Sequence, residues 1–289
     1  MGPVFRTSSG RRVGVHEHDH GTRRTVVLCH PTGGSGAVDP DPALSAARGI
    51  RLLAVDRPGY GRSDPLARAD DSAVEQAAAD LAEVLDARDA REVGLVGWGE
   101  GGWTAAALAA ARPELVYRLV LVATPALDTA LPYLPPELRA AARGPQDPAL
   151  VADAIRGVLG FTSSVPEAAA VVRVLHRSSA DDAVLERPGA REALATMVDA
   201  AYAHGDAGVL ADLLEALARP PAIDPETIRA KTLLLYGQND PAVPPRHATW
   251  WKKRLPHSRI EITPRAGHLL LFGMWSRTLS HLAPKTTTN

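Results

Sequence analysis

The sequence predicts an α/β fold in which a mostly parallel central sheet is flanked by helices and covered by a helical cap. Short runs rich in β-branched residues alternate with Ala- and Leu-rich amphipathic segments, which is typical of parallel strands joined by crossover helices. Turn-forming segments open directly after several of these runs. Between about residues 126 and 225 the strand-like runs stop, and only helical segments broken by prolines remain.

The strands and two of the helices can be placed along the chain. Six apolar runs predict strands, at residues 25–29, 50–55, 93–96, 119–122, 232–236 and 259–262. Ser72 is a typical N-cap for a helix that we expect to end near residue 88. An Ala-rich helix is expected at 103–112, directly after a glycine-rich turn.

The length allows one large domain with an insertion. The chain has 289 residues. We expect residues 1–125 and 226–289 to form the core domain and residues 126–225 to form the cap. A proline-rich stretch at 220–225 is expected to return the chain to the sheet.

Composition argues against several kinds of partner. Lys and Arg number 32 and Asp and Glu 33, so a net charge of −1 gives no basic field for nucleic acid or an anionic membrane. The single cysteine, Cys29, cannot form an internal disulfide, and neither a secretory leader nor an apolar run of about 18 residues is present. We therefore expect a cytoplasmic protein without a cofactor that acts on a small organic substrate, and its oligomeric state is left open.

Five turn segments follow the predicted strands in order: HPTGGSG, DRPGYGRSD, GWGEGG, YGQNDPAVP and RAGH. In this order and at these separations they resemble the α/β-hydrolase family from about Val26 to His281. The resemblance implies an α/β-hydrolase fold with a cap, and a catalytic triad carried by the turn segments.

The third segment departs from the family at its most important position. The family's turn between strand and helix has the pattern small-x-nucleophile-x-small, and Gly97 and Gly101 match the small positions. Gly99 stands where the nucleophilic serine is expected. The triad acid corresponds to Asp240 and the triad histidine to His268.

Further site residues follow from the same resemblance. The backbone N–H groups of Thr32 and Glu100 match the oxyanion hole, although Pro31 replaces the usual glycine and has no N–H. Trp98 and His30 are assigned to substrate binding.

Three other features have less specific interpretations. His16, His18 and His20 could line one face of a strand and bind zinc, but without further ligands nearby a solvent-facing edge strand is the better prediction, and no metal site is proposed. The segment 56–64 is expected to shape a loop near the entrance. Glu100 is a secondary candidate for an acid or base, with a solvated or paired carboxylate as its alternative.

Apolar side chains of the cap predict a hydrophobic substrate or, alternatively, the cap's own core. They are Leu131, Tyr133, Leu134, Leu159, Phe161, Val165, Val171, Val172, Leu175 and Met197.

Three functions stay open. The chain could be a Ser-His-Asp hydrolase for an ester, lactone or thioester that was inactivated by the replacement of its serine with Gly99. Alternatively, Gly99 is native, and the Asp240–His268 dyad acts as a general base on water or in elimination, cyclisation or carbon–carbon cleavage. The third hypothesis is a noncatalytic ligand-binding protein.

Overall fold

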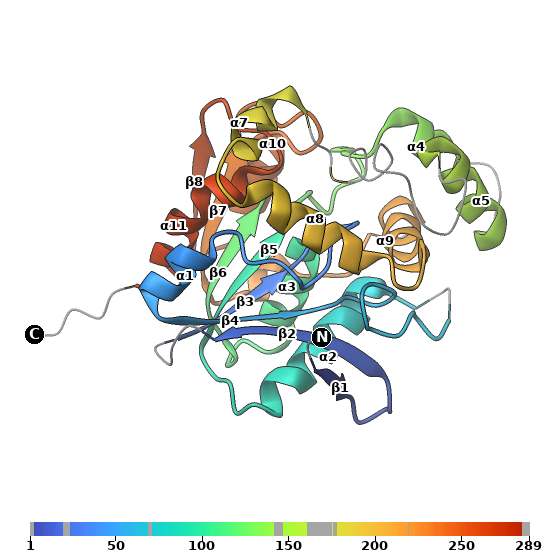
Figure 1. Ribbon diagram of the computed structural model, residues 1–289. Helices are drawn as coiled ribbons and strands as arrows, with labels where there is room; N and C mark the ends of the chain where they lie inside the picture. The colour runs from blue at the N-terminus through green and yellow to red at the C-terminus, as the bar shows by residue number, and fades with distance from the viewer. Residues whose placement is uncertain are drawn as a thin grey trace, which may run out of the picture.

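The computed structural model describes residues 3–19, 24–68, 71–141, 147–160, 175, 178–218 and 220–284. Its centre is an eight-stranded sheet with the order β1-β2-β4-β3-β5-β6-β7-β8 (Figure 1). The strands are β1 (Val4–Arg6), β2 (Arg12–Asp19), β3 (Arg24–Cys29), β4 (Ile50–Val55), β5 (Val93–Trp98), β6 (Val116–Val122), β7 (Lys231–Gly237) and β8 (Ser258–Thr263). The six strands β4, β3, β5, β6, β7 and β8 pair in parallel with their neighbours. Strand β2 pairs antiparallel with both β1 and β4.

The predicted α/β-hydrolase architecture is confirmed, and each of the six expected strands is present. Five of them are longer than expected, by one to three residues. Strand β5 extends to Trp98, which pairs with Val122, and β6 begins at Val116. Every residue of β5 is buried, as expected for a central parallel strand with both faces covered.

The prediction of a solvent-facing edge strand for the early histidines is wrong for the residues that the structure describes. Strand β2 lies inside the sheet, between β1 and β4. His16 is mostly buried, and its Nε2 lies 2.9 Å from Oδ1 of Asp56. The three-residue strand β1 has too little periodicity to be found from sequence. His20 lies outside the described residues, among which no group of three or more His, Cys, Asp or Glu could hold a metal ion.

Helices cover both faces of the sheet. They are α1 (Pro42–Arg48), α2 (Ala73–Asp86), α3 (Gly101–Ala111), α10 (Arg246–Lys252) and α11 (Leu270–Leu282). Gly94 of β5 approaches Leu282 of α11, whereas Gly97 approaches Gly102 of α3. Residues an odd number apart on a strand face opposite sides, so α3 and α11 lie on opposite faces.

Helix α2 illustrates how the sequence specifies these elements. Ser72 caps it as expected, with its hydroxyl accepting a hydrogen bond from the Glu75 N–H. Its buried stripe, from Val74 to Leu85, repeats at helical spacing and packs toward the core.

Between residues 126 and 225 every element that the structure describes is a helix, as the sequence predicts. They are α4 (Pro136–Ala141), α5 (Pro148–Leu159), η1 (Ser179–Asp181), α7 (Asp182–Leu185), α8 (Ala190–Ala201), α9 (Ala207–Ala218) and η2 (Pro225–Thr227). In Figure 1, α8 and α9 cross above the sheet, and α4 and α5 lie farther out on the right. None of the helices in the described part of the chain is long and apolar enough to cross a membrane.

The segment that carries α8 and α9 is tied to the loops of the core. The Ser35 hydroxyl donates to the Met197 carbonyl at 2.7 Å, and the Gly61 N–H donates to the Ala201 carbonyl at 3.1 Å. These bonds place α8 next to the loops that follow β3 and β4.

Candidate active site

Asp240 and His268 lie together at the carboxyl end of the sheet, in the loops after β7 and β8. Asp240 Oδ2 lies 2.7 Å from Nδ1 of His268, and both side chains are buried. The other carboxylate oxygen of Asp240 accepts hydrogen bonds from the N–H groups of Ala242 and Val243, each at 2.9 Å. Three hydrogen bonds therefore hold the carboxylate in one orientation and leave Nε2 of His268 facing away from it.

The dyad is electrostatically coupled. Burial lowers the pKa of His268, but the carboxylate of Asp240, reinforced by those of Glu100 and Asp181, outweighs burial and raises this pKa above its ordinary value. Burial raises the pKa of Asp240, but the attraction of His268 and the backbone N–H donors lower it overall. The positive form of the imidazole is thus stabilised in this site.

The Nε2 atom of His268 faces the turn between β5 and α3. Gly99 in this turn has φ of +56°, a conformation that glycine adopts without the Cβ penalty. A Cβ built on Gly99 would lie 3.5 Å from His268 Nε2 and 3.1 Å from Cβ of Pro31. The position after β5 is therefore directed at the imidazole.

Close packing explains the small residues on either side of Gly99. A Cβ on Gly97 would lie 2.4 Å from Cα of Gly102, and one on Gly101 would lie 2.3 Å from the Cys29 carbonyl oxygen. Both contacts are with backbone, which cannot move aside as a flexible side chain can. A side chain at either position would force the backbone of this turn or of its neighbour to shift.

A buried carboxylate lies beside this turn. Glu100 is only 3% exposed, and its Oε2 accepts a hydrogen bond of 3.3 Å from the backbone N–H of Thr32. Burial raises the pKa of Tyr133, and the charges of Glu100 and Asp212 together with a hydrogen bond to Glu100 raise it further. The amide that the sequence assigns to an oxyanion hole thus contacts a carboxylate from the neighbouring turn.

An ion pair links the loops of the site to α9. Arg57 donates to both carboxylate oxygens of Asp212, at 2.7 and 2.6 Å, and all of these groups are buried. The hydroxyls of Tyr60 and Thr32 also donate to Asp212, at 2.7 and 2.8 Å. Segment 56–64 therefore positions the site through Arg57 and Tyr60. Sequence reasoning missed Asp212, because nothing in its helical segment distinguishes it from a surface carboxylate.

His30 and Trp98, which the sequence assigns to substrate binding, are both fully buried. His30 Nε2 accepts from the Arg57 N–H at 3.0 Å, so its Nδ1 carries the proton and donates to the Pro31 carbonyl at 2.9 Å. Burial, aided by the Arg57 charge, lowers the pKa of His30 to about 3. Trp98 donates from Nε1 to the His268 carbonyl at 3.0 Å. Because their polar atoms bond to backbone, these residues position the loops of the site.

A pocket of about 740 Å³ reaches Thr32 and Glu100. Its described lining is Thr32, Glu100, Pro132, Tyr133, Leu134, Pro135, Pro136, Glu137, Leu138, Arg139, Val158, Leu159, Leu213, Pro241, Ala242 and Arg246. Three apolar residues expected at the substrate, Tyr133, Leu134 and Leu159, line it, whereas Leu175 and Met197 do not and are buried in the core. Phe161, Val165, Val171 and Val172 lie outside the described residues.

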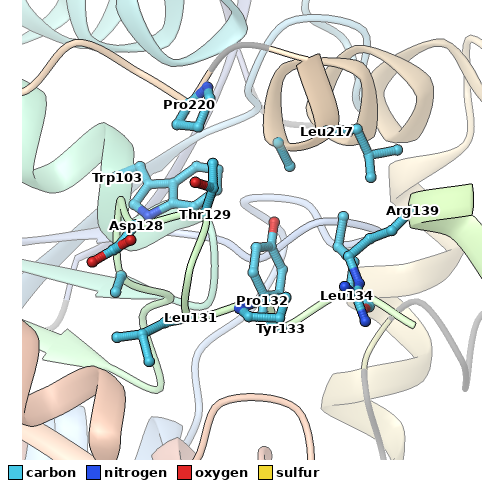
Figure 2. A pocket seen from close by; sticks show the side chains of 12 residues that line it. Trp103, Asp128, Thr129, Leu131, Pro132, Tyr133, Leu134, Arg139, Leu217 and Pro220 are labelled. Atoms are coloured by element: carbon cyan, nitrogen blue, oxygen red, sulfur yellow. The ribbon is translucent and has the colours of Figure 1, made fainter. Parts of the chain in front are cut away.

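A second pocket, of about 210 Å³, shares the segment around Tyr133 with the first. Figure 2 shows Tyr133 between Trp103 on one side and Leu217 on the other. The rings of Trp103 and Tyr133 meet edge to face, with centroids 5.8 Å apart. Tyr133 thus forms part of the wall between the two pockets, and Leu131 lines only the smaller one.

The arrangement of strands, turn and dyad agrees with a comparison of sequences. Residues 24–273 match a family described as the alpha/beta hydrolase fold. The chain belongs to the α/β-hydrolase family. This α/β-hydrolase is 31% identical over 254 residues to a pimeloyl-[acyl-carrier protein] methyl ester esterase of Neisseria meningitidis, covering 85% of this chain and 86% of the relative.

Other relatives include enzymes with different substrates. The chain is 28% identical over 265 residues to the 2-hydroxy-6-oxo-2,4-heptadienoate hydrolase of Pseudomonas putida, covering 87% of this chain and 84% of the relative. In structure it is similar to a thermophilic esterase from Thermogutta terrifontis, with a TM-score of 0.68 and 22% identity, covering 95% of this chain and 93% of that one. These two sequence relatives are an esterase and a hydrolase, and the structural likeness supports the fold.

Proposed function

We propose that this α/β-hydrolase acts on a small hydrophobic organic carbonyl compound by proton transfer through the Asp240–His268 dyad, without an acyl-enzyme. The observation that carries the proposal is the 3.5 Å between His268 Nε2 and the place of a Cβ on Gly99. In a serine hydrolase of this family the nucleophile occupies that place. A glycine there offers no atom that can attack a carbonyl, and it leaves space next to Nε2 for water or for a substrate atom.

The dyad can do the chemistry that remains. His268 Nε2 exchanges a proton with water or with the substrate, while Asp240 holds Nδ1–H and stabilises the imidazolium that forms. Both groups are buried, so their mutual attraction is screened less than it would be in water. Positioned general acid–base catalysis contributes about 10²–10⁴-fold in rate.

Glu100 favours a native Gly99 over a serine enzyme that has lost only its nucleophile. An oxyanion hole needs N–H donors aimed at the site where negative charge develops. Here the Thr32 N–H instead bonds to the carboxylate of Glu100. Two adjacent positions, Gly99 and Glu100, therefore both depart from what acyl transfer requires.

The second candidate is the serine hydrolase inactivated at Gly99. Its support is the turn itself, since the φ of +56° and the direction toward His268 suit a nucleophile. Loss of a triad nucleophile can cost about 10⁶-fold in turnover. On this alternative, the present chain would turn over esters very weakly, and a restored serine would suffice to activate it.

We also propose residues 126–225 as a cap over a core formed by residues 1–125 and 226–289. Support comes from the pocket, whose lining combines Thr32 and Glu100 of the core with Tyr133, Leu134 and Leu159 of the cap. Its apolar side chains suit a hydrophobic ligand.

The test is a panel of chromogenic esters, lactones, thioesters and enolisable ketones, supplied to the parent and to His268→Ala, with products detected by mass spectrometry. We expect the parent to turn over at least one compound, the variant to lose this turnover, and the intact mass of the parent to show no acyl adduct. Equal turnover by the variant, or an acyl adduct on the parent, contradicts the proposal. Ligand binding without any product would indicate a binding protein instead.

A further inference from the structure

Asp181 is a fully buried carboxylate in the segment proposed as the cap. It is the last residue of η1 and the N-cap of α7, and its Oδ1 accepts a hydrogen bond of 2.8 Å from the backbone N–H of Leu269. Leu269 directly follows His268 and precedes α11 (Figure 1). The bond therefore joins the proposed cap to the loop of the core that carries the histidine of the dyad.

The carboxylate of Asp181 is itself held in one orientation. Its Oδ2 accepts hydrogen bonds from the backbone N–H and the hydroxyl of Ser178, at 3.0 and 3.3 Å. Each of these partners donates to Asp181, which suits an ionised carboxylate, because that form accepts at both oxygens and has no proton to donate. The capping box between Ser178 and Asp181 thus orients the carboxylate from its own side of the contact.

The peptide group between His268 and Leu269 is bonded at both ends. Asp181 accepts its N–H, and Nε1 of Trp98 donates to its carbonyl oxygen at 3.0 Å. Because the peptide group is planar, two bonds at its opposite ends restrict its rotation and set the direction in which the side chain of His268 leaves the backbone. The bond from Nδ1 to Asp240 then sets the rotation of the ring.

Gly267, on the other side of His268, leaves room for the same carboxylate. A Cβ on Gly267 would lie 2.5 Å from each of the two oxygens of Asp181, which is closer than real Cβ atoms approach. The φ of Gly267 is not positive, so the backbone conformation does not require glycine here. Asp181 therefore contacts both chain neighbours of His268, Leu269 by a hydrogen bond and Gly267 by close packing.

We propose that Asp181 is a positioning residue, which holds the backbone on both sides of His268 so that Nε2 faces Gly99 while Nδ1 bonds to Asp240. It acts through His268 rather than on the substrate. Burial lowers the pKa of His268, and the charge of Asp181 adds to those of Asp240 and Glu100 in raising it. The inference rests on the proposed function for its effect on turnover, whereas its effect on His268 can be measured without a substrate.

The test follows the proton on Nδ1 of His268 by ¹H NMR. This proton lies in a buried hydrogen bond to Asp240 and should resonate far downfield, and its signal is assigned by its loss in His268→Ala. The pKa of His268 is measured from the pH dependence of its ring protons, and kcat and KM are measured on the compound that the parent converts.

Three variants change the contact in different ways. Asp181→Ala removes the carboxylate, and Asp181→Asn keeps an oxygen that can accept the Leu269 N–H. Gly267→Ala keeps the charge but displaces the carboxylate. Asp182→Ala is the matched control, since Asp182 is the next residue in the chain and is exposed.

We expect Asp181→Ala to weaken or abolish the downfield signal, to lower the pKa of His268, and to lower kcat about 10²-fold at a similar KM, because a misplacement of about 1 Å can cost that factor. Asp181→Asn should retain more signal and more turnover than Asp181→Ala, and Asp182→Ala should match the parent. Gly267→Ala should weaken the signal in the parent but change little further in Asp181→Ala, since the two changes act on one contact.

A signal and a pKa of His268 that stay at the parent's values in both Asp181 variants overturn the proposal, whatever their melting temperatures, because Asp181 would then contribute only to stability. A full further loss on adding Gly267→Ala to Asp181→Ala also contradicts it. If the signal changes as expected while neither Asp181→Ala nor His268→Ala alters turnover, the proposed function fails, and the positioning of His268 by Asp181 stands.

Discussion

Replacing Gly99 by serine should create a nucleophile but not an efficient esterase. The new Cβ would lie 3.5 Å from His268 Nε2, so the hydroxyl, one bond further out, can come within the hydrogen-bond reach of about 2.6–3.2 Å that activation requires. The strain is tolerable, because a residue other than glycine in the left-handed region costs about 1–2 kcal/mol. The 3.1 Å contact with Cβ of Pro31 needs a shift of a few tenths of an ångström.

Glu100 limits what this serine can do. With its carboxylate on the Thr32 N–H, Glu100 occupies the donor that the family resemblance assigns to an oxyanion hole. Loss of one such donor costs about 10²–10³-fold in turnover. Gly99→Ser should therefore form a covalent adduct with a fluorophosphonate yet hydrolyse esters slowly, and Gly99→Ser/Glu100→Leu should be about 10²–10³-fold faster.

The assay compares the parent, both variants and Glu100→Leu alone on short and medium chromogenic esters, with intact-mass detection of the adduct. The parent and Glu100→Leu, which both lack the hydroxyl, are the controls and should form no adduct. If Gly99→Ser alone hydrolyses esters as fast as the double variant, Glu100 does not obstruct the oxyanion hole. The chain would then be a serine hydrolase lacking only its nucleophile.

Three further predictions concern stability. Folding raises the pKa of His268 and lowers the pKa of Asp240. Their pairing therefore stabilises the fold fully between about pH 4 and 6.5. This stabilisation is lost as the pH rises through the folded-state pKa of His268, or as it falls through the folded-state pKa of Asp240. Asp240→Asn should accordingly lower the free energy of unfolding most within that range, as urea titrations at several pH values would show; a pH-independent loss contradicts the coupling. Arg57→Leu leaves Asp212 as a buried anion without its cation, so it should lower the free energy of unfolding, measured in urea, by about 3–5 kcal/mol. A decrease below about 1 kcal/mol would mean that the pair is solvated. Gly97→Ala should lower the free energy of unfolding by about 1–3 kcal/mol, because its Cβ would clash with backbone. Gly157→Ala has open space around its Cβ and should stabilise the helix by up to about 1 kcal/mol. Equal melting temperatures of the two variants would contradict the packing argument.

The sheet could be anticipated from local patterns, and the meeting of Asp240 with His268 from the resemblance to the α/β-hydrolase family. Parallel strands are marked by short buried runs, and their carboxyl ends converge on one edge of the sheet. Asp240 and His268 each follow such a run, and their match to the triad acid and histidine of the α/β-hydrolase family implies that they are close in space. Their catalytic role stays a proposal.

The contacts of Glu100 and Asp212 could not be anticipated, because they depend on packing between distant segments. Asp212 lies 155 positions from Arg57, and the Thr32 N–H that bonds to Glu100 lies 68 positions from it. Neither pair has a spacing or composition that marks it in the sequence. The placement of His16 was missed for a related reason, since the short strand β1 that covers β2 has no recognisable pattern.

We propose that the dyad transfers protons at Gly99 without a covalent intermediate. The most direct measurement is the rate at which the parent and His268→Ala convert the same compound, with the intact mass of each protein recorded during turnover. We expect a rate at least about 10²-fold lower for His268→Ala and an unchanged mass for the parent throughout. An equal rate, or a parent that gains the mass of an acyl group, would contradict it.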